Sequence, residues 1–168
     1  MGIIMKAAYL LMGGNLGDRL GFMAKAKEKM QQKGIKILRQ SSIYETAAWG
    51  IQDQPSFLNQ VLEIVTSFDP EELLNELLFI ERSLGRIRTG KNGARTIDID
   101  ILYYENLVIN KPGLTVPHER ISFRRFVLVP LTELIPGFID PKTNKTILDM
   151  LNDCKDNLEV TFYEKTEK

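Results

Sequence analysis

The fold class is indicated most clearly by residues 69–104, whose sequence is DPEELLNELLFIERSLGRIRTGKNGARTIDIDILYY. Asp69 can cap a helix, with proline at the first helical position and a glutamate three residues after the cap. Leucines then recur at helical spacing until Gly85, and Thr96 to Tyr104 has the composition of a strand. This segment predicts a helix and a strand joined by a glycine-bearing loop.

Four earlier elements are expected from apolar runs, caps and glycines. They are strands over residues 7–12, 35–44 and 57–68, and a helix capped by Asp18 that runs to about Lys33. The Gly13-Gly14 pair is expected to stop the first strand in a tight turn. The order β-α-β-β-α-β predicts an α+β fold (an α/β sandwich) with a ferredoxin-like core, a mainly antiparallel sheet and helices on one face.

The rest of the chain is expected to extend this core. Residues 107–109 are expected to pair back on the preceding strand through Glu105-Asn106. Residues from about 110 to 168 add a loop, one or two helices and a last strand near 158–163. No linker or repeat divides the sequence, so residues 1–168 are interpreted as one domain with a C-terminal extension.

Composition excludes several classes of site and partner. The chain has 22 Lys and Arg against 22 Asp and Glu, and a neutral total argues against a general nucleic-acid binder. His118 and Cys154 are the single residues of their types, which excludes an intrachain disulfide, a cysteine-based zinc site and a two-histidine site. The N-terminal apolar stretch is too short to span a bilayer. The single cysteine suits a reducing cytoplasm, so we expect a cytoplasmic protein. We also expect a monomer with no nucleic-acid or membrane partner.

The two acidic residues of the last core strand are candidate metal ligands. Alternate side chains of a strand share a face, so Ile97, Ile99 and Ile101 would point into the core while Asp98 and Asp100 project from the other face. Residues two apart on a strand lie about 6–7 Å from each other. Such a pair can hold two hard cations, as phosphoryl-transfer enzymes require. The alternative is a solvated outer face.

A basic segment lies directly before these carboxylates. It runs from Arg82 to Arg95 and contains five basic residues, three glycines and no acid. Guanidinium forks bind phosphate oxygens, so the segment suggests an anion held between arginines and bound magnesium; the alternative is a solvated loop. Gly85 to Asn92 resembles a phosphate-binding loop but lacks its Ser or Thr, so we assign it no such role.

Two further groups are ambiguous from sequence. His118 is followed closely by Arg120 and two more arginines, so its imidazole is either structural or a donor to phosphate. Phe57 shares a strand face with Asn59, and an aromatic ring beside an amide suits a flat, nitrogen-rich heterocycle. Aromatic residues in the core are the alternative for Phe57, Trp49 and Phe126.

Five blocks resemble the 6-hydroxymethyl-7,8-dihydropterin pyrophosphokinase family. They are GGNLGD at 13–18, QDQPSFLN at 52–59, GRIR at 85–88, KNGARTIDIDI at 91–101 and LTVPH at 114–118. The resemblance runs from about Ala8 to Pro136 in order. It implies a folate-pathway enzyme with a ferredoxin-like fold that transfers pyrophosphate from ATP to the pterin hydroxymethyl group, releases AMP and uses two Mg²⁺ ions.

The resemblance also implies roles for individual residues. Asp98 and Asp100 would bind the metal ions and, with Arg86 and Arg95, form the catalytic group. ATP would be held by Glu81, Arg86, Arg88, Arg95, Ile101, Thr115, His118 and Arg124, and the pterin by Thr46, Ala47, Trp49, Phe57, Asn59 and Phe126. No covalent nucleophile is evident, which agrees with direct in-line transfer. Asn92 and Gly113 replace a Trp and an Arg of some relatives, which puts two local contacts in question.

Two other functions remain alternatives at this point. One is a non-catalytic ferredoxin-like module that senses a nucleotide. The other is a single-stranded RNA binder, because such a sheet can display aromatic and arginine side chains. Asp98 and Asp100 on the exposed face would repel a phosphate backbone, which disfavours RNA.

Overall fold

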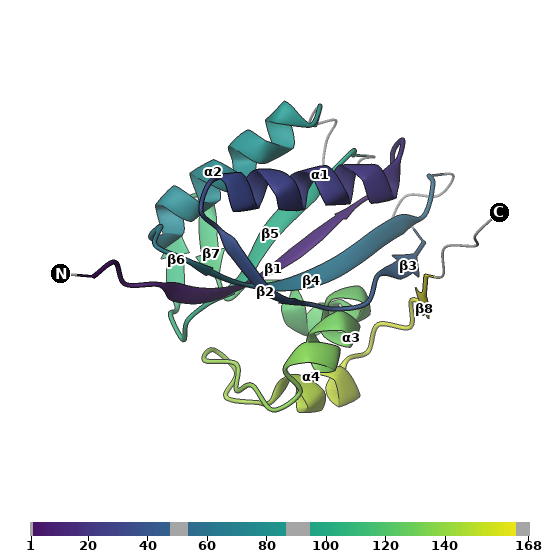
Figure 1. Cartoon of the computed structure of the whole chain (residues 1–168). Coiled ribbons are helices and arrows are strands. Elements are labelled where there is room, and N and C mark those ends of the chain that lie inside the picture. Colours follow the sequence, from purple (N-terminus) through teal and green to yellow (C-terminus); the bar gives the residue numbers. More distant parts are fainter. Residues whose placement is uncertain (1, 48–53, 87–94, 164–168) are drawn as a thin grey trace.

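The structure is a computed structural model that describes residues 2–47, 54–86 and 95–163 (Figure 1). An open sheet forms the middle layer, with helices on both of its faces. The elements are β1 (Lys6–Gly14), α1 (Arg19–Gln32), β2 (Lys36–Gln40), β3 (Tyr44–Thr46), β4 (Phe57–Thr66), α2 (Pro70–Ser83), β5 (Asp98–Tyr104), β6 (Ile109–Lys111), β7 (Leu114–Val116), a 3₁₀ turn η1 (Ile121–Phe123), α3 (Arg125–Leu134), α4 (Ile147–Asp153) and β8 (Val160–Phe162).

The sheet confirms the predicted ferredoxin-like order. Its strands lie in the order β5-β1-β4-β3-β8, and β2 also pairs with β4. Every pairing in this sheet is antiparallel. The predicted caps are also present, since Asp18 accepts from Gly21 N at 3.0 Å and Asp69 accepts from Glu72 N at 2.8 Å. Gly34 and Gly85 follow the two helices with positive φ, which suits a helix end.

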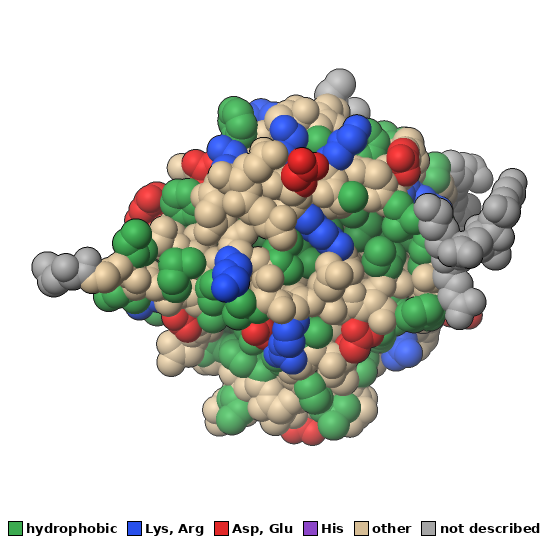
Figure 2. Space-filling model, in the orientation of Figure 1, with side chains coloured by type: hydrophobic (Ala, Val, Ile, Leu, Met, Phe, Trp, Pro, Cys, Tyr) green, Lys and Arg blue, Asp and Glu red, His purple; other side chains and the backbone are tan. Residues whose placement is uncertain are grey.

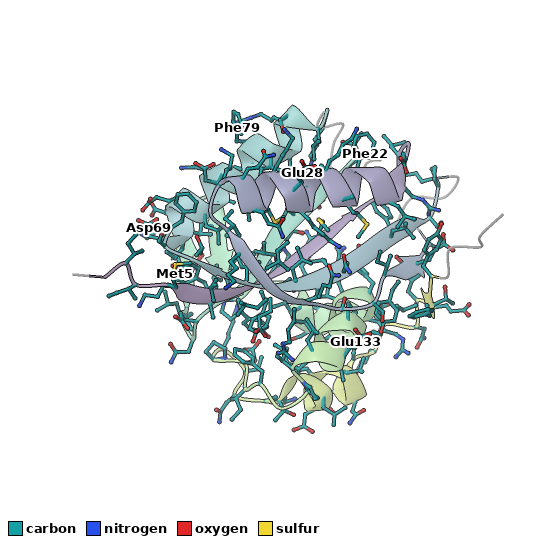
Figure 3. The ribbon with its side chains drawn as sticks, in the orientation of Figure 1. Met5, Phe22, Glu28, Asp69, Phe79 and Glu133 are labelled. Carbon is teal, nitrogen blue, oxygen red and sulfur yellow. The ribbon has the colours of Figure 1, made fainter. Side chains whose placement is uncertain are left out.

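Two apolar layers sandwich the sheet. One core lies between the sheet and helices α1 and α2, with Leu10, Leu62 and Leu77 among its fully buried members. The second lies on the opposite face, where Tyr103 and Val61 of the sheet pack against Leu128 and the rest of α3 and α4. Figure 3 shows Glu133 of α3 below the sheet and Glu28 of α1 above it. Helices were expected on one face of the core, and the C-terminal segment corrects this by covering the other.

The strand predictions for residues 35–44 and 107–109 were wrong. The strand expected over residues 35–44 is divided into β2 and β3, because Ser41 between them hydrogen bonds to β4 through its side chain. Residues 107–109 do not pair back on β5. The chain turns away at Glu105, whose φ is +48°, and β6 pairs with β7 instead. Pro112-Gly113 supplies the turn of that hairpin, as proline followed by a positive-φ glycine does in type II turns.

The Gly13-Gly14 pair was expected to end the first strand, yet β1 continues through both residues. A Cβ at Gly13 would lie 2.5 Å from Asn59 Oδ1, and one at Gly14 would lie 2.3 Å from the carbonyl oxygen of Thr96. The glycines are therefore required by close approach: they let β1 pass between β4 and the segment that leads into β5.

We expect Gly14→Ala to destabilise the protein, because the nearest obstacle is backbone and cannot rotate away. Overpacking of this kind costs about 1–3 kcal/mol, which corresponds to a loss of roughly 3–10 °C in Tm for a chain of this length. Thermal unfolding measures it. Gly137→Ala is the matched control, since nothing lies within 4 Å of its added Cβ. Equal Tm values for the two variants would contradict the close-approach explanation.

Candidate active site

Two cavities meet at the outer strand β5. The first, of about 540 Å³, is lined by residues of β1, β3, β4, β5 and α3. The second, of about 610 Å³, lies between α2, β5 and β7. Both are lined by the same five residues: Arg86, Asp98, Asp100, His118 and Glu119. Ligands bound in the two cavities would therefore meet at a junction that carries both signs of charge.

Strand alternation places the two carboxylates at this junction. Ile97, Ile99 and Ile101 are buried in the core beneath α2, and Asp98 and Asp100 line the first cavity. This confirms the alternation expected from the sequence, since neighbouring side chains of a strand point to opposite faces.

An ion-pair network surrounds Asp98. The Arg86 guanidinium donates to Glu81 and to Asp98 Oδ1, and Arg95 Nη1 donates to Asp98 Oδ2 at 3.0 Å. Glu81 is 2% exposed and also accepts from the backbone N–H of Ile99 at 3.1 Å. Buried acids of this kind are stable only when paired. The network thus fixes Arg86 between α2 and β5.

The pKa values of Asp98, Asp100 and the neighbouring Glu81 are shifted in different directions. Burial and the neighbouring Asp98 raise the pKa of Asp100 to about 7, and burial together with Asp98 raises the pKa of Glu81 to about 8. Burial opposes ionisation of Asp98 as well, but Arg86, a hydrogen bond with Glu81 and Arg95 together outweigh it and lower the pKa of Asp98. Acids that are crowded together in this way gain most from a bound cation.

In a buffer whose chelator removes divalent metal ions, we expect Asp100→Asn to stabilise the protein at alkaline pH. The pKa of this carboxyl is raised from 3.8 to about 7, so the parent loses stability as pH rises through that interval and the loss is complete above it. Asparagine carries no such charge. At pH 8 the Tm of the variant should exceed the parent's by about 5 °C or more, and this difference should shrink as the pH falls and vanish near the ordinary pKa of 3.8. A difference that does not vary with pH would contradict this.

His118 is held by its backbone and its ring. Its backbone N–H donates to the carbonyl oxygen of Leu102 at 3.0 Å, and its ring Nδ1 accepts from the backbone N–H of Arg120 at 3.3 Å. Burial lowers the pKa of His118, which favours the neutral ring. Because Nδ1 acts as an acceptor, Nε2 carries the hydrogen and can donate to a ligand in the cavities.

The wall of the first cavity away from the junction is aromatic and amide-bearing. Phe57, Asn59 and Phe126 line it together with Thr46 and Ala47. Asn59 Nδ2 donates to Thr46 Oγ1 at 3.3 Å. The guanidinium of Arg95 lies 5.3 Å from the centroid of the Phe57 ring, and that of Arg124 lies 5.6 Å from the centroid of the Phe126 ring.

Most of the remaining candidate residues from the sequence line the second cavity. Glu81, Ile101 and Thr115 line it, and Gly113 lies at the same wall. Arg88, Asn92 and Trp49 fall outside the residues that the structure describes. All the other candidate residues from the sequence line one or both cavities.

The structure adds Asn15, to which the sequence had assigned no role. Its side chain is 2% exposed and donates to Gln54 Oε1 at 3.1 Å and Pro55 O at 3.0 Å, while its Oδ1 accepts from Arg95 N at 2.9 Å. Asn15 thereby connects the segments on either side of the first cavity. In the sequence, Asn15 could have been identified because it is a polar residue directly after a buried strand.

The face shown in Figure 2 intersperses acidic and basic side chains with apolar ones. Of the helices described, none has both the length and the apolar composition that a membrane crossing requires.

Comparison with known proteins gives a consistent family. The family model described as 7,8-dihydro-6-hydroxymethylpterin-pyrophosphokinase matches residues 9–136. The 2-amino-4-hydroxy-6-hydroxymethyldihydropteridine pyrophosphokinase of Aquifex aeolicus is 41% identical over 143 residues, which cover 85% of this chain and 89% of that protein. The folic acid synthesis protein of Pneumocystis carinii is 43% identical over 142 residues, 84% of this chain but 19% of that protein. The chain therefore spans about a fifth of this fungal relative.

Solved structures resemble the fold. A Plasmodium falciparum HPPK-DHPS structure with pteroate superimposes with a TM-score of 0.72 at 16% identity, covering 90% of this chain and 43% of that chain. At this identity the likeness concerns the fold alone.

Proposed function

The chain belongs to the 7,8-dihydro-6-hydroxymethylpterin-pyrophosphokinase family, and we propose that it transfers the terminal pyrophosphate of ATP to the hydroxymethyl group of 6-hydroxymethyl-7,8-dihydropterin, releasing AMP. This is a pyrophosphokinase reaction of folate synthesis with small-molecule substrates. The junction of two cavities at Asp98, Arg86 and His118 carries the proposal, because the reaction needs two ligands to meet at a phosphate-binding point.

The pterin belongs in the first cavity. A flat ring can lie between Phe57 and Phe126. The amide of Asn59 both donates and accepts, so it can hydrogen bond to polar atoms at the edge of that ring. Thr46 and Ala47 complete this wall, with Trp49 assigned to it by the family resemblance. The hydroxymethyl group would then point toward the junction.

ATP belongs across the junction and in the second cavity. Ile101 and Thr115 would lie against the nucleoside, and Glu81 would hold Arg86 in place on that side. Arg86, Arg95, Arg124 and His118 would bind phosphate oxygens, with Arg88 added by the family resemblance. The first two arginines already converge on Asp98, so a phosphate bound there is within reach of both.

Asp98 and Asp100 would hold two Mg²⁺ ions. Two carboxylates are the hard oxygen donors that Mg²⁺ prefers. Burial and the neighbouring Asp98 raise the pKa of Asp100 although nearby arginines oppose them, so a bound cation would offset the cost of its charge. No group of three His, Cys, Asp or Glu that could hold a metal ion occurs among the described residues, so phosphate oxygens and water would complete the coordination. When bound, the ions neutralise phosphate charge and orient the attacking and leaving oxygens.

The mechanism that follows is direct in-line transfer. The two walls hold the hydroxymethyl oxygen against the β-phosphorus, so that positioning supplies much of the catalysis. Arg95, Arg86 and the Nε2–H of His118 stabilise the charge that spreads over the transferred group.

A nucleotide-sensing module without catalysis is not favoured, because relatives named as pyrophosphokinases match most of the chain. We propose that residues 1–168 act as one cytoplasmic, monomeric unit.

The experiment that tests this function identifies the nucleotide product. The protein is incubated with ATP, Mg²⁺ and 6-hydroxymethyl-7,8-dihydropterin, and the nucleotides are separated. AMP formed in equal amount with the pterin diphosphate, and only when the pterin is present, supports the proposal. ADP as product, or no turnover by folded protein, would refute it.

A further inference from the structure

Arg19, the first residue of α1, holds three separate segments with one side chain. Its Nη1 donates to Glu45 Oε2 at 3.0 Å, to the Ser56 carbonyl oxygen at 3.0 Å and to Ser56 Oγ at 3.1 Å. Ser56 Oγ in turn donates to Glu45 Oε2 at 2.9 Å. The guanidinium also lies 5.6 Å from the centroid of the Tyr163 ring. We call Arg19, Glu45, Ser56 and Tyr163 the Arg19 clamp.

The clamp lies on the face of the sheet opposite the pterin cavity. In the β3–β4 pairing, Thr46 is opposite Phe57 and Glu45 is opposite Leu58. Since opposed residues share a face and neighbours alternate, Glu45 points with Leu58 toward the helical core, whereas Thr46 and Phe57 point toward the cavity. No clamp residue lines either cavity. Arg19 therefore lies outside the described lining of both cavities proposed to hold substrate.

The clamp compensates for a weak strand. β3 has three residues, and so short a strand frays readily unless other contacts hold it. The clamp ties the end of β3 to the residue before β4, the two points from which Thr46 and Phe57 enter the cavity wall. β8 pairs with the other edge of β3, and Tyr163 N donates to Ile43 O at 2.9 Å. The C-terminal strand thus joins the same support.

We propose that Arg19 is a positioning residue for the pterin, which sets the distance between Thr46 on β3 and Phe57 on β4 from the far side of the sheet. This inference rests on the proposed function, because it assigns the pterin to that wall. The nucleoside part of the ATP site is built from elements outside the clamp: Glu81, Ile101 and Thr115 come from α2, β5 and β7. Loss of the clamp should therefore weaken pterin binding and leave ATP binding unchanged.

The test compares Arg19→Ala and Arg19→Lys with the parent enzyme. Removing hydrogen bonds from a charged donor should raise the KM and the Kd for the pterin by about tenfold in Arg19→Ala, with the KM for ATP unchanged. Arg19→Lys keeps the charge but not the planar fork, so an intermediate KM is expected. Arg39→Ala is the matched control, because it removes an ion pair of 2.6 Å to Glu63 on the same sheet, away from both cavities.

A double variant separates the clamp from general destabilisation. If Arg19 acts through Glu45, the pterin KM of Arg19→Ala/Glu45→Gln should be close to that of Arg19→Ala alone. An unchanged pterin KM in Arg19→Ala, or equal rises in the KM values for pterin and ATP, would overturn the inference. Failure of the proposed function is distinguishable, because it appears as absence of AMP formation by the parent enzyme.

Discussion

Replacing Asp98 or Asp100 with alanine is expected to lower turnover by about three orders of magnitude or more. Either change removes a carboxylate from the point where the two cavities meet, at which we propose that Mg²⁺ binds. Stabilisation by metal ions and positioned charges is the main source of catalysis in phosphoryl transfer, because the protein contributes little covalent chemistry. Steady-state AMP formation measures the effect.

Metal binding gives a second, independent readout of the same change. In the parent, Mg²⁺ added with a non-hydrolysable ATP analogue should raise Tm, and Asp98→Ala or Asp100→Ala should abolish most of that rise. Asp153→Ala is the control, because Asp153 is exposed and pairs with Lys145 away from the cavities. Turnover within tenfold of the parent in folded Asp98→Ala protein would remove Asp98 from the metal-binding role.

Arg95→Ala is expected to lower kcat by about 10²–10³-fold. Arg95 alone among the described residues combines a 3.0 Å ion pair to Asp98 with a place over the Phe57 ring, so it adjoins both the proposed phosphate site and the proposed pterin wall. Removing one preorganised cation from a transferring phosphoryl group costs about this much. Arg95→Lys should recover part of the loss, since it keeps the charge without the fork.

Arg82→Ala is the matched control for Arg95, because both belong to the basic segment recognised in the sequence. Arg82 lies in the last turn of α2, is exposed and lines neither cavity. Its loss should leave kcat and both KM values unchanged. Comparable losses in the two variants would mean that the segment acts through its total charge, against the specific contacts proposed for Arg95.

The core order and the main candidate residues followed from sequence because they depend on neighbours along the chain. Asp69 caps α2 through a residue three positions away, and Asp98 and Asp100 share a face because a strand alternates. The wrong predictions concern segments whose strand pairing depends on which of several possible partners is nearby in the folded chain. Residues 107–109 were expected to pair back on the strand before them, but the strand that forms, β6 (Ile109–Lys111), pairs with β7 through the turn at Pro112-Gly113.

By itself, the sequence determined the boundaries of α1 and α2, the burial of the isoleucines of β5 and the convergence of acidic and basic groups near Asp98. Only the tertiary structure decided which distant segments support them. Asn15 accepts from Arg95 across 80 residues, and Arg19 reaches Glu45 and Ser56 across 26 and 37. Gly14 is required because the Thr96 backbone passes against it. Local hydrogen bonds and periodicity act over a few residues, whereas these contacts exist only once the sheet has brought its strands together.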